Sequence, residues 1–156
     1  MLSGQMADAR ERLLASIEGL TEEEMLQPGV CGEWSVRDVL AHVAAWDRET
    51  TAMFEAMLQG ERHYFLDLDE DGLEQFNQNR HAAARDMSVS DAVAELTASR
   101  EALIALLKGT DNVKLFAPAP GDEHADMSLA ACLSAQISHD EEHAEMIEEW
   151  RGNTNG

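Results

Sequence analysis

Four stretches of the chain repeat apolar residues at the three- and four-residue spacing of a helix that buries one face. They cover residues 3–20, 35–58, 88–109 and 128–151. Alanine, leucine, methionine and glutamate dominate the chain, and such side chains lose little rotamer freedom in a helix. Only 3 prolines interrupt the 156 residues. The pattern therefore predicts an all-α fold, a four-helix bundle.

Two of the helix starts carry a specific signal. Ser35 and Ser88 each stand three residues before an acid, Asp38 and Asp91 respectively. A hydroxyl and a carboxylate at this spacing can satisfy the free backbone N–H groups of a first helical turn, in a variant of the capping box. We therefore expect helices to begin at these two serines.

The connections between the four segments are unequal in length. Residues 59–87 form the longest one and are expected to contain a short helix at 73–85. A crossover of this length can return the chain to the same end of the bundle, so we expect an up-down-down-up order. We expect a single domain at residues 1–151 and a disordered tail at 152–156.

The formal net charge of −20, from 11 basic and 31 acidic residues, limits the partners of the chain. Phosphate contacts need clustered Lys and Arg, so we expect no nucleic-acid partner, and the same repulsion disfavours a membrane surface. No apolar run approaches the ~18 residues of a spanning helix, and the amino terminus lacks the pattern of a secretory signal. We therefore expect a cytoplasmic protein in which Cys31 and Cys132 remain free thiols.

Histidines interrupt the apolar stripe of the last helical segment. Steps of three and four residues mark its inward face: Cys132, Gln136, His139, His143, Met146 and Trp150. A purely structural helix would place Leu or Ile at the two histidine positions. Residues at i and i+4 lie one turn apart on the same face, so the imidazoles of His139 and His143 can share one ion.

The segment at 35–58 shows the same anomaly, because His42 lies between Val39 and Trp46 on its buried side. A buried neutral imidazole carries a donor and an acceptor that both need partners. Convergence of His42 with His139 and His143 on one divalent metal would explain all three. Zinc or nickel fits imidazole best, with iron or manganese as alternatives, and three protein ligands leave open positions for water or substrate. The alternative is that a hydroxyl or a carbonyl satisfies each histidine separately.

Other polar residues receive weaker assignments. The remaining histidines are expected at the surface or rim: His63, His81 and His124. Cys132 is expected in the core, and Trp34 is expected to pack under the start of the helix at 35–58. The acids beside the histidines are expected to be solvated, with the orientation of an imidazole or a proton relay as the alternative: Asp47, Asp140, Glu141 and Glu142.

Two motifs resemble one known family. One pair of motifs is similar to the DinB-like superfamily of metal-binding four-helix bundles. The first motif is Gly32-Glu-Trp-Ser-Val-Arg-Asp-Val-Leu-Ala-His42-Val-Ala-Ala-Trp46-Asp, and the second is His139-Asp-Glu-Glu-His143-Ala-Glu-Met-Ile. The middle of the chain, Phe76-Asn-Gln-Asn-Arg80 leading to Ser90-Asp-Ala-Val-Ala-Glu-Leu, resembles the ClbS/DfsB-type branch. The resemblance implies that the metal-binding positions of the family fall on His42, His139 and His143. It also implies an up-down-down-up fold and a relationship to thiol-dependent transferases, some of which use a low-molecular-weight thiol as cofactor.

Two functional hypotheses follow. The first is a metal-dependent enzyme, a thiol S-transferase or hydrolase, that activates a thiol or water against a small electrophilic substrate. The second is a non-catalytic stress or resistance protein that sequesters a small molecule and uses the metal structurally. A homodimer is compatible with either. A zinc protease is disfavoured because Asp140 replaces the glutamate of the HExxH motif, and a di-iron site because no Glu-x-x-His pair occurs at these histidines.

Overall fold

The computed structural model describes residues 1–122 and 126–155, so the assignment of His124 lies outside the described residues. Four long helices lie side by side: α1 (Leu2–Ser16), α3 (Val36–Leu58), α5 (Val89–Lys108) and α7 (Leu129–Thr154). Helix α3 packs mainly against α5, and α1 packs mainly against α7. No strand occurs in this described part of the chain. The predicted all-α class is therefore confirmed.

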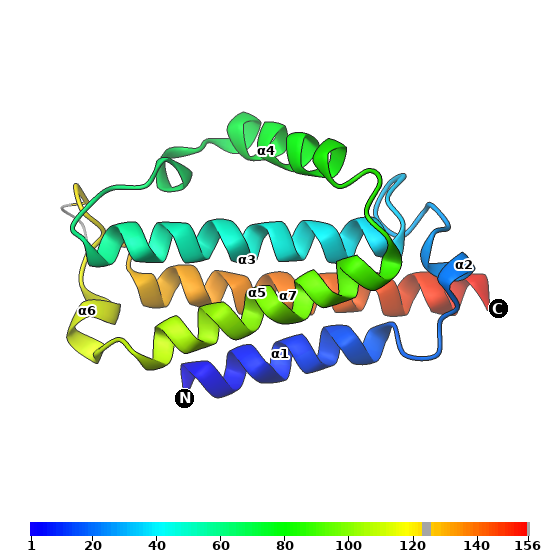
Figure 1. The fold of residues 1–156 in the computed structure, drawn as a ribbon, viewed down its shortest axis with the longest axis horizontal. Coiled ribbons are helices and arrows are strands. Elements are labelled where there is room, and N and C mark those ends of the chain that lie inside the picture. The colour runs from blue at the N-terminus through cyan, green and yellow to red at the C-terminus, as the bar shows by residue number, and fades with distance from the viewer. Residues whose placement is uncertain (123–125, 156) are drawn as a thin grey trace.

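Figure 1 shows that α3 and α5 run in one direction and that α1 and α7 run in the other. The segment between α3 and α5 crosses the outer face of α3 and contains a short 3-10 helix, η1 (Tyr64–Asp67), and α4 (Glu70–Ala83). Both of these elements contact α3. The crossover therefore adds a further layer over α3.

Two short helices were not predicted from the sequence: α2 (Glu22–Met25) and α6 (Asn112–Phe116). Helix α1 ends at Ser16 and not at residue 20, because a new helix begins soon afterwards. The hydroxyl of Thr21 accepts from the backbone N–H of Glu24 at 3.1 Å, and the Glu24 carboxylate accepts from the Thr21 N–H at 3.1 Å. Gly19 supplies the turn between α1 and α2 with a φ of 81°.

Both predicted serine caps are present. The Ser35 hydroxyl accepts from the backbone N–H of Asp38 at 3.2 Å, and the Asp38 carboxylate accepts from the Ser35 N–H at 3.0 Å. The Ser88 hydroxyl likewise accepts from the N–H of Asp91 at 3.0 Å. At the other end of the chain, α7 continues to Thr154, so residues 152–154 are helical although the sequence placed them in the tail.

The apolar core has two parts with a polar layer between them. One part gathers around Val36, Leu40 and Ile147, and the other around Met6, Phe54 and Leu133. On each long helix, the residues between these two clusters include a buried charged side chain, and on α7 they also include His139 and His143. The polar layer therefore lies at mid-bundle. No helix in the described ranges is both long enough and apolar enough to cross a membrane.

Candidate metal centre

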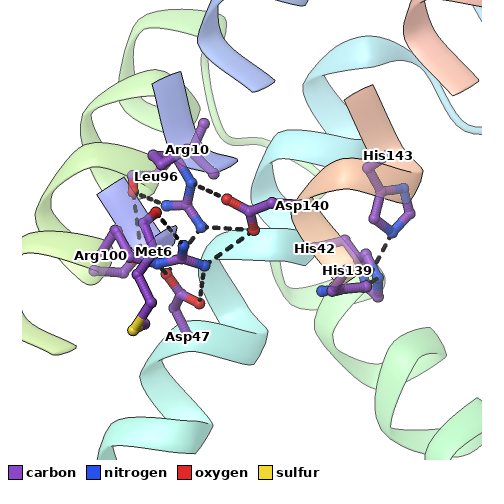
Figure 2. A network of polar contacts seen from close by, with 10 residues as sticks. Met6, Arg10, His42, Asp47, Leu96, Arg100, His139, Asp140 and His143 are labelled. Carbon is purple, nitrogen blue, oxygen red and sulfur yellow. Dashed lines mark hydrogen bonds and ion pairs between the residues drawn. The ribbon is translucent and has the colours of Figure 1, made fainter. Parts of the chain in front are cut away.

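Helices α3 and α7 bring the three predicted histidines together. The Nε2 atom of His139 lies 2.9 Å from Nε2 of His42 and 3.0 Å from Nε2 of His143. The candidate ligand atoms of all three rings lie within 4.8 Å of one another. Figure 2 shows the three rings gathered where α7 passes α3. His42 and His143 are buried, and His139 is partly buried.

The structure does not provide a separate partner for these rings. Among the described residues, the hydrogen-bonding contacts of the three imidazoles are only with one another. The Nδ1 atoms of His139 and His143 are buried and have no hydrogen-bond partner in residues 1–122 and 126–155. The alternative in which a hydroxyl or carbonyl satisfies each histidine separately therefore has no support here.

Hydrogen bonds between the rings cannot satisfy all three nitrogens either. One ring nitrogen of a neutral imidazole carries either a single proton or a single in-plane lone pair. The Nε2 atom of His139 contacts two neighbours at once, so it can form a well-directed hydrogen bond with only one of them. A cation shared by the three lone pairs would satisfy every Nε2 atom together.

The rings are held in the neutral form that a metal requires. Burial lowers the pKa of His42 to about 3, with the neighbouring His143 as a smaller cause. Burial also lowers the pKa of His139 to about 2, assisted by the two other histidines and by the charges of Arg10 and Arg100. For His143 burial lowers the pKa to about 4, against an opposing effect of Asp140.

The donor set is compatible with one divalent ion. Imidazole nitrogens bind Zn at ~2.0–2.1 Å, which in tetrahedral geometry separates two ligand nitrogens by about 3.4 Å. The two contacts at 2.9 and 3.0 Å are a few tenths of an ångström shorter, so a small displacement of the rings would bring these pairs to that separation. Neutral imidazole suits several first-row divalent metals, so the ligand atoms do not select one of them.

Two tryptophans wall the centre. The ring centroid of Trp34 lies 5.0 Å from that of His42, and Trp34 also stacks on His81 at 5.1 Å. The ring of Trp46 lies 5.9 Å from His42 and 5.0 Å from His139. Trp34 was expected only to pack under the start of α3, so its contact with a candidate ligand is an addition that the sequence did not indicate.

The expectation that Asp47 and Asp140 are solvated is wrong. Both side chains are fully buried, and neither contacts the histidine rings through a hydrogen bond. Arg10 donates to Asp140 at 2.7 Å and to Asp47 at 2.9 Å, and Arg100 donates to Asp47 at 2.9 and 3.0 Å and to Asp140 at 3.0 Å. Figure 2 shows these four residues beside the histidines, with Asp140 on the side nearer to them.

We call Arg10, Asp47, Arg100 and Asp140 the buried charge quartet. Each residue comes from a different long helix, and the quartet has no net formal charge. Backbone carbonyls complete the hydrogen bonding, because Arg10 also donates to the carbonyl of Leu96 and Arg100 to that of Met6. Buried charges are tolerated when they are paired and hydrogen-bonded in this way.

Sequence reasoning missed the two arginines although a signal was available. Arg10 lies at helical spacing between Met6 and Leu13, and Arg100 lies between Leu96 and Leu103. All four of these apolar neighbours are fully buried. An arginine on an apolar stripe indicates a buried partner of opposite charge, by the same argument that identified the histidines.

The other assigned residues lie outside the centre. His63 is partly buried, with its Nδ1 atom accepting from the backbone N–H of Phe65 and its Nε2 atom 3.6 Å from a carboxylate oxygen of Glu49. His81 is partly exposed, beside Trp34. Glu141 and Glu142 are exposed, and Cys132 is buried, as expected.

The chain matches one known family over most of its length. The family model of the DinB superfamily matches residues 5–147, so the chain belongs to the DinB superfamily. The resemblance seen in the sequence motifs is thereby confirmed. No curated protein matches the chain.

Solved structures show the same fold at low sequence identity. An uncharacterised protein from Escherichia coli UTI89 is 16% identical, with a TM-score of 0.83 over 99% of this chain and 92% of that chain. The sibling lethal factor precursor DfsB is 14% identical, with a TM-score of 0.84 over 98% and 94%. The colibactin self-resistance protein ClbS, solved in complex with double-stranded DNA, is 14% identical, with a TM-score of 0.80 over 95% and 91%.

Proposed function

We propose that this chain is a metal-dependent enzyme that holds one divalent ion on His42, His139 and His143 and acts on a small electrophilic substrate. The observation that supports the proposal is the meeting of three Nε2 atoms whose only described polar contacts are with one another. Three protein ligands leave coordination positions for a reactant, as in catalytic metal sites. The ion, when bound, would supply the charge that lets a thiol or water lose its proton at neutral pH.

The histidines, the two tryptophans and the buried charge quartet have different roles in this proposal. Burial keeps the three imidazoles neutral, so that their lone pairs remain free for the ion over the physiological pH range. Trp34 and Trp46 cover the rings and limit the access of water. The buried charge quartet fixes α3 relative to α7 and thereby holds His42 against His139.

A non-catalytic role in resistance is the second candidate. It is favoured by the fold that the chain shares with ClbS, which is described as a self-resistance protein. In this alternative the protein would bind a small toxic molecule without converting it. Although ClbS was solved with DNA, we propose a small molecule as the partner here, because 31 acidic residues against 11 basic ones oppose phosphate contacts. The cytoplasmic location, the stress-response role and the homodimer stay predictions.

The metal centre is tested by elemental analysis of the purified protein and of three variants, His42→Ala, His139→Ala and His143→Ala. We expect about one equivalent of a first-row divalent metal in the parent protein and loss of the metal in each variant. His81→Ala is the matched control, because this histidine lies near the centre but outside the converging set. Metal retained in all three variants, or lost equally in the control, would contradict the proposal.

Catalysis is tested separately with a thiol and a panel of small electrophiles. We expect turnover that is abolished by a chelator, restored by added metal and absent from His42→Ala. Product formation that is indifferent to the chelator excludes the enzymatic role. Stoichiometric binding of an electrophile without turnover supports the resistance role instead.

A further inference from the structure

A cavity of about 260 Å³ lies between α3, α7 and the crossover. Helix α3 contributes Trp46, Thr50 and Met53, and helix α7 contributes Cys132 and Gln136. The ring of Trp46 also contacts His139, and Gln136 lies three residues before His139 on the same helix. The cavity is therefore next to the candidate metal centre, and the two share a wall.

The crossover provides the opposite wall. Phe65, Leu66, Leu68 and Leu73 line the cavity from η1, α4 and the residues joining them. None of the described residues around the cavity carries a charge. An ionised ligand would lose its hydration there without gaining a counter-charge, so the lining disfavours anions and cations alike.

Two residues of the lining each carry a buried polar side-chain atom without a partner in the described part of the chain. The hydroxyl Oγ1 of Thr50 and the amide Oε1 of Gln136 are buried, and neither has a hydrogen-bond partner among residues 1–122 and 126–155. The residues themselves are only 1% and 4% exposed. A buried polar atom without a partner is destabilising, by about 1–3 kcal/mol. Two such atoms on residues that line one otherwise apolar cavity indicate a ligand that supplies their missing hydrogen bonds.

We infer that this cavity binds an uncharged, largely apolar molecule that carries an amide-like group, with an N–H donor for Gln136 and a carbonyl acceptor for Thr50. The volume falls below the ~300–1,000 Å³ of typical drug-sized sites, so the bound portion is small. The inference rests on the proposed function in one respect only, namely that the reactive end of the bound molecule would lie against the histidines. It names a neutral amide as the substrate class and excludes a charged thiol cofactor from this cavity.

The test uses three probes of nearly equal size: N-methylbenzamide, propiophenone and benzoate. Propiophenone replaces the amide N–H by a methylene group, and benzoate carries a charge. Binding is followed by the indole N–H signal of Trp46 in ¹⁵N-labelled protein, because Trp46 lines the cavity, while Trp150 at the far end of α7 serves as reference. We expect the amide to shift the Trp46 signal with an affinity about three- to tenfold higher than that of the ketone. Benzoate is expected to give no shift.

Two variants separate ligand binding from a structural role. Thr50→Val and Gln136→Leu remove the unpartnered atoms with little change in volume. We expect Gln136→Leu to abolish the preference for the amide over the ketone and Thr50→Val to weaken binding of both probes. Neither variant should lower the thermal midpoint of the ligand-free protein, since each removes a buried atom that lacks a partner there. A lowered midpoint in both variants, an amide preference that survives Gln136→Leu, or equal binding of benzoate would overturn the inference.

Metal content is measured on the same samples, so the two proposals can fail independently. Protein that binds the amide at Trp46 but holds no metal keeps the present inference and refutes the metal centre. Protein that holds one equivalent of metal but shows no response at Trp46 keeps the metal centre and refutes the present inference. A response of Trp150 alone places the probe elsewhere and also overturns the assignment of the cavity.

Discussion

Replacement of Arg100 by leucine is expected to destabilise the fold strongly. The guanidinium of Arg100 is 2% exposed and makes three hydrogen bonds to carboxylates, at 2.9, 3.0 and 3.0 Å. A fourth hydrogen bond, at 2.9 Å, goes to the carbonyl of Met6. Without this side chain, Asp47 and Asp140 would share Arg10 alone, and one buried carboxylate would lack a counter-charge.

The magnitude follows from the burial of the partners. Removal of one member of a buried ion pair decreases the free energy of unfolding by about 3–5 kcal/mol, out of a total of about 5–15 kcal/mol for a domain. For a chain of this length each kcal/mol lowers the thermal midpoint by roughly 2–4 °C. The expected decrease for Arg100→Leu is therefore about 6–20 °C, measured by circular dichroism in metal-free protein.

A matched surface variant and a neutral replacement sharpen the test. Arg12 pairs with Glu148 at 3.3 Å across an exposed surface, so Arg12→Leu should change the midpoint little. Replacement of all four quartet residues by Leu or Met should restore most of the stability that Arg100→Leu loses, because no charge then remains unpaired. A decrease for Arg100→Leu no larger than that for Arg12→Leu would refute the reasoning that the quartet is a closed, desolvated network.

Three further outcomes are expected. The pKa values of His42, His139 and His143, about 3, 2 and 4, lie below the ordinary value, so below pH 6.5 the unfolded state binds more protons than the folded state. In urea titrations of metal-free protein, the free energy of unfolding should therefore decrease as the pH falls from 6.5 to 4, by up to about 1.4 kcal/mol per pH unit for each histidine. It should stay constant above pH 6.5. A flat profile over the whole range would show that the rings are not buried. Ser35→Ala removes the cap of α3 and should lower stability by about 1 kcal/mol in the same titrations, whereas no change would mean that the cap is dispensable. Arg37 donates to the carbonyls of residues 84, 85 and 87, so Arg37→Ala should accelerate amide hydrogen exchange around the end of α4 without affecting α7, and uniform acceleration would instead indicate global destabilisation.

The convergence of the histidines was predictable because each of them breaks a strong local pattern. An imidazole where a helix should place leucine requires a partner, and two helices with such positions can supply it to each other. The serine caps were predictable for a similar reason, because Ser35 and Asp38 form their hydrogen bonds with each other and lie only three residues apart. Periodicity and capping both act over one or two helical turns, which is the range over which a single sequence is informative.

The charge quartet and the cavity depend on contacts that a single sequence does not reveal. Asp47 and Arg100 are 53 residues apart in the chain, and Arg10 and Asp140 are 130 apart. An aspartate near a helix surface is solvated by default, and only the packing of four helices brings these two inside. The cavity wall comes from the crossover, where Phe65 and Leu66 lie in irregular or 3-10 structure without a helical repeat.

The histidines and the quartet together explain how a very acidic chain can hold three neutral imidazoles as candidate metal ligands. Asp140 follows His139 directly on α7, yet its charge is balanced by Arg10 and Arg100, which themselves help to lower the pKa of His139. A lone buried aspartate at this position would instead stabilise protonated imidazole and so compete with a metal for the ring nitrogens. The two arginines oppose that competition at His139 and also tie α3 to α7, so one buried network influences both the charge state of His139 and the spacing of the histidines. The buried charge quartet and the three histidines therefore act as a single polar unit, in which the quartet controls the environment of the histidines without being part of the candidate ligand set.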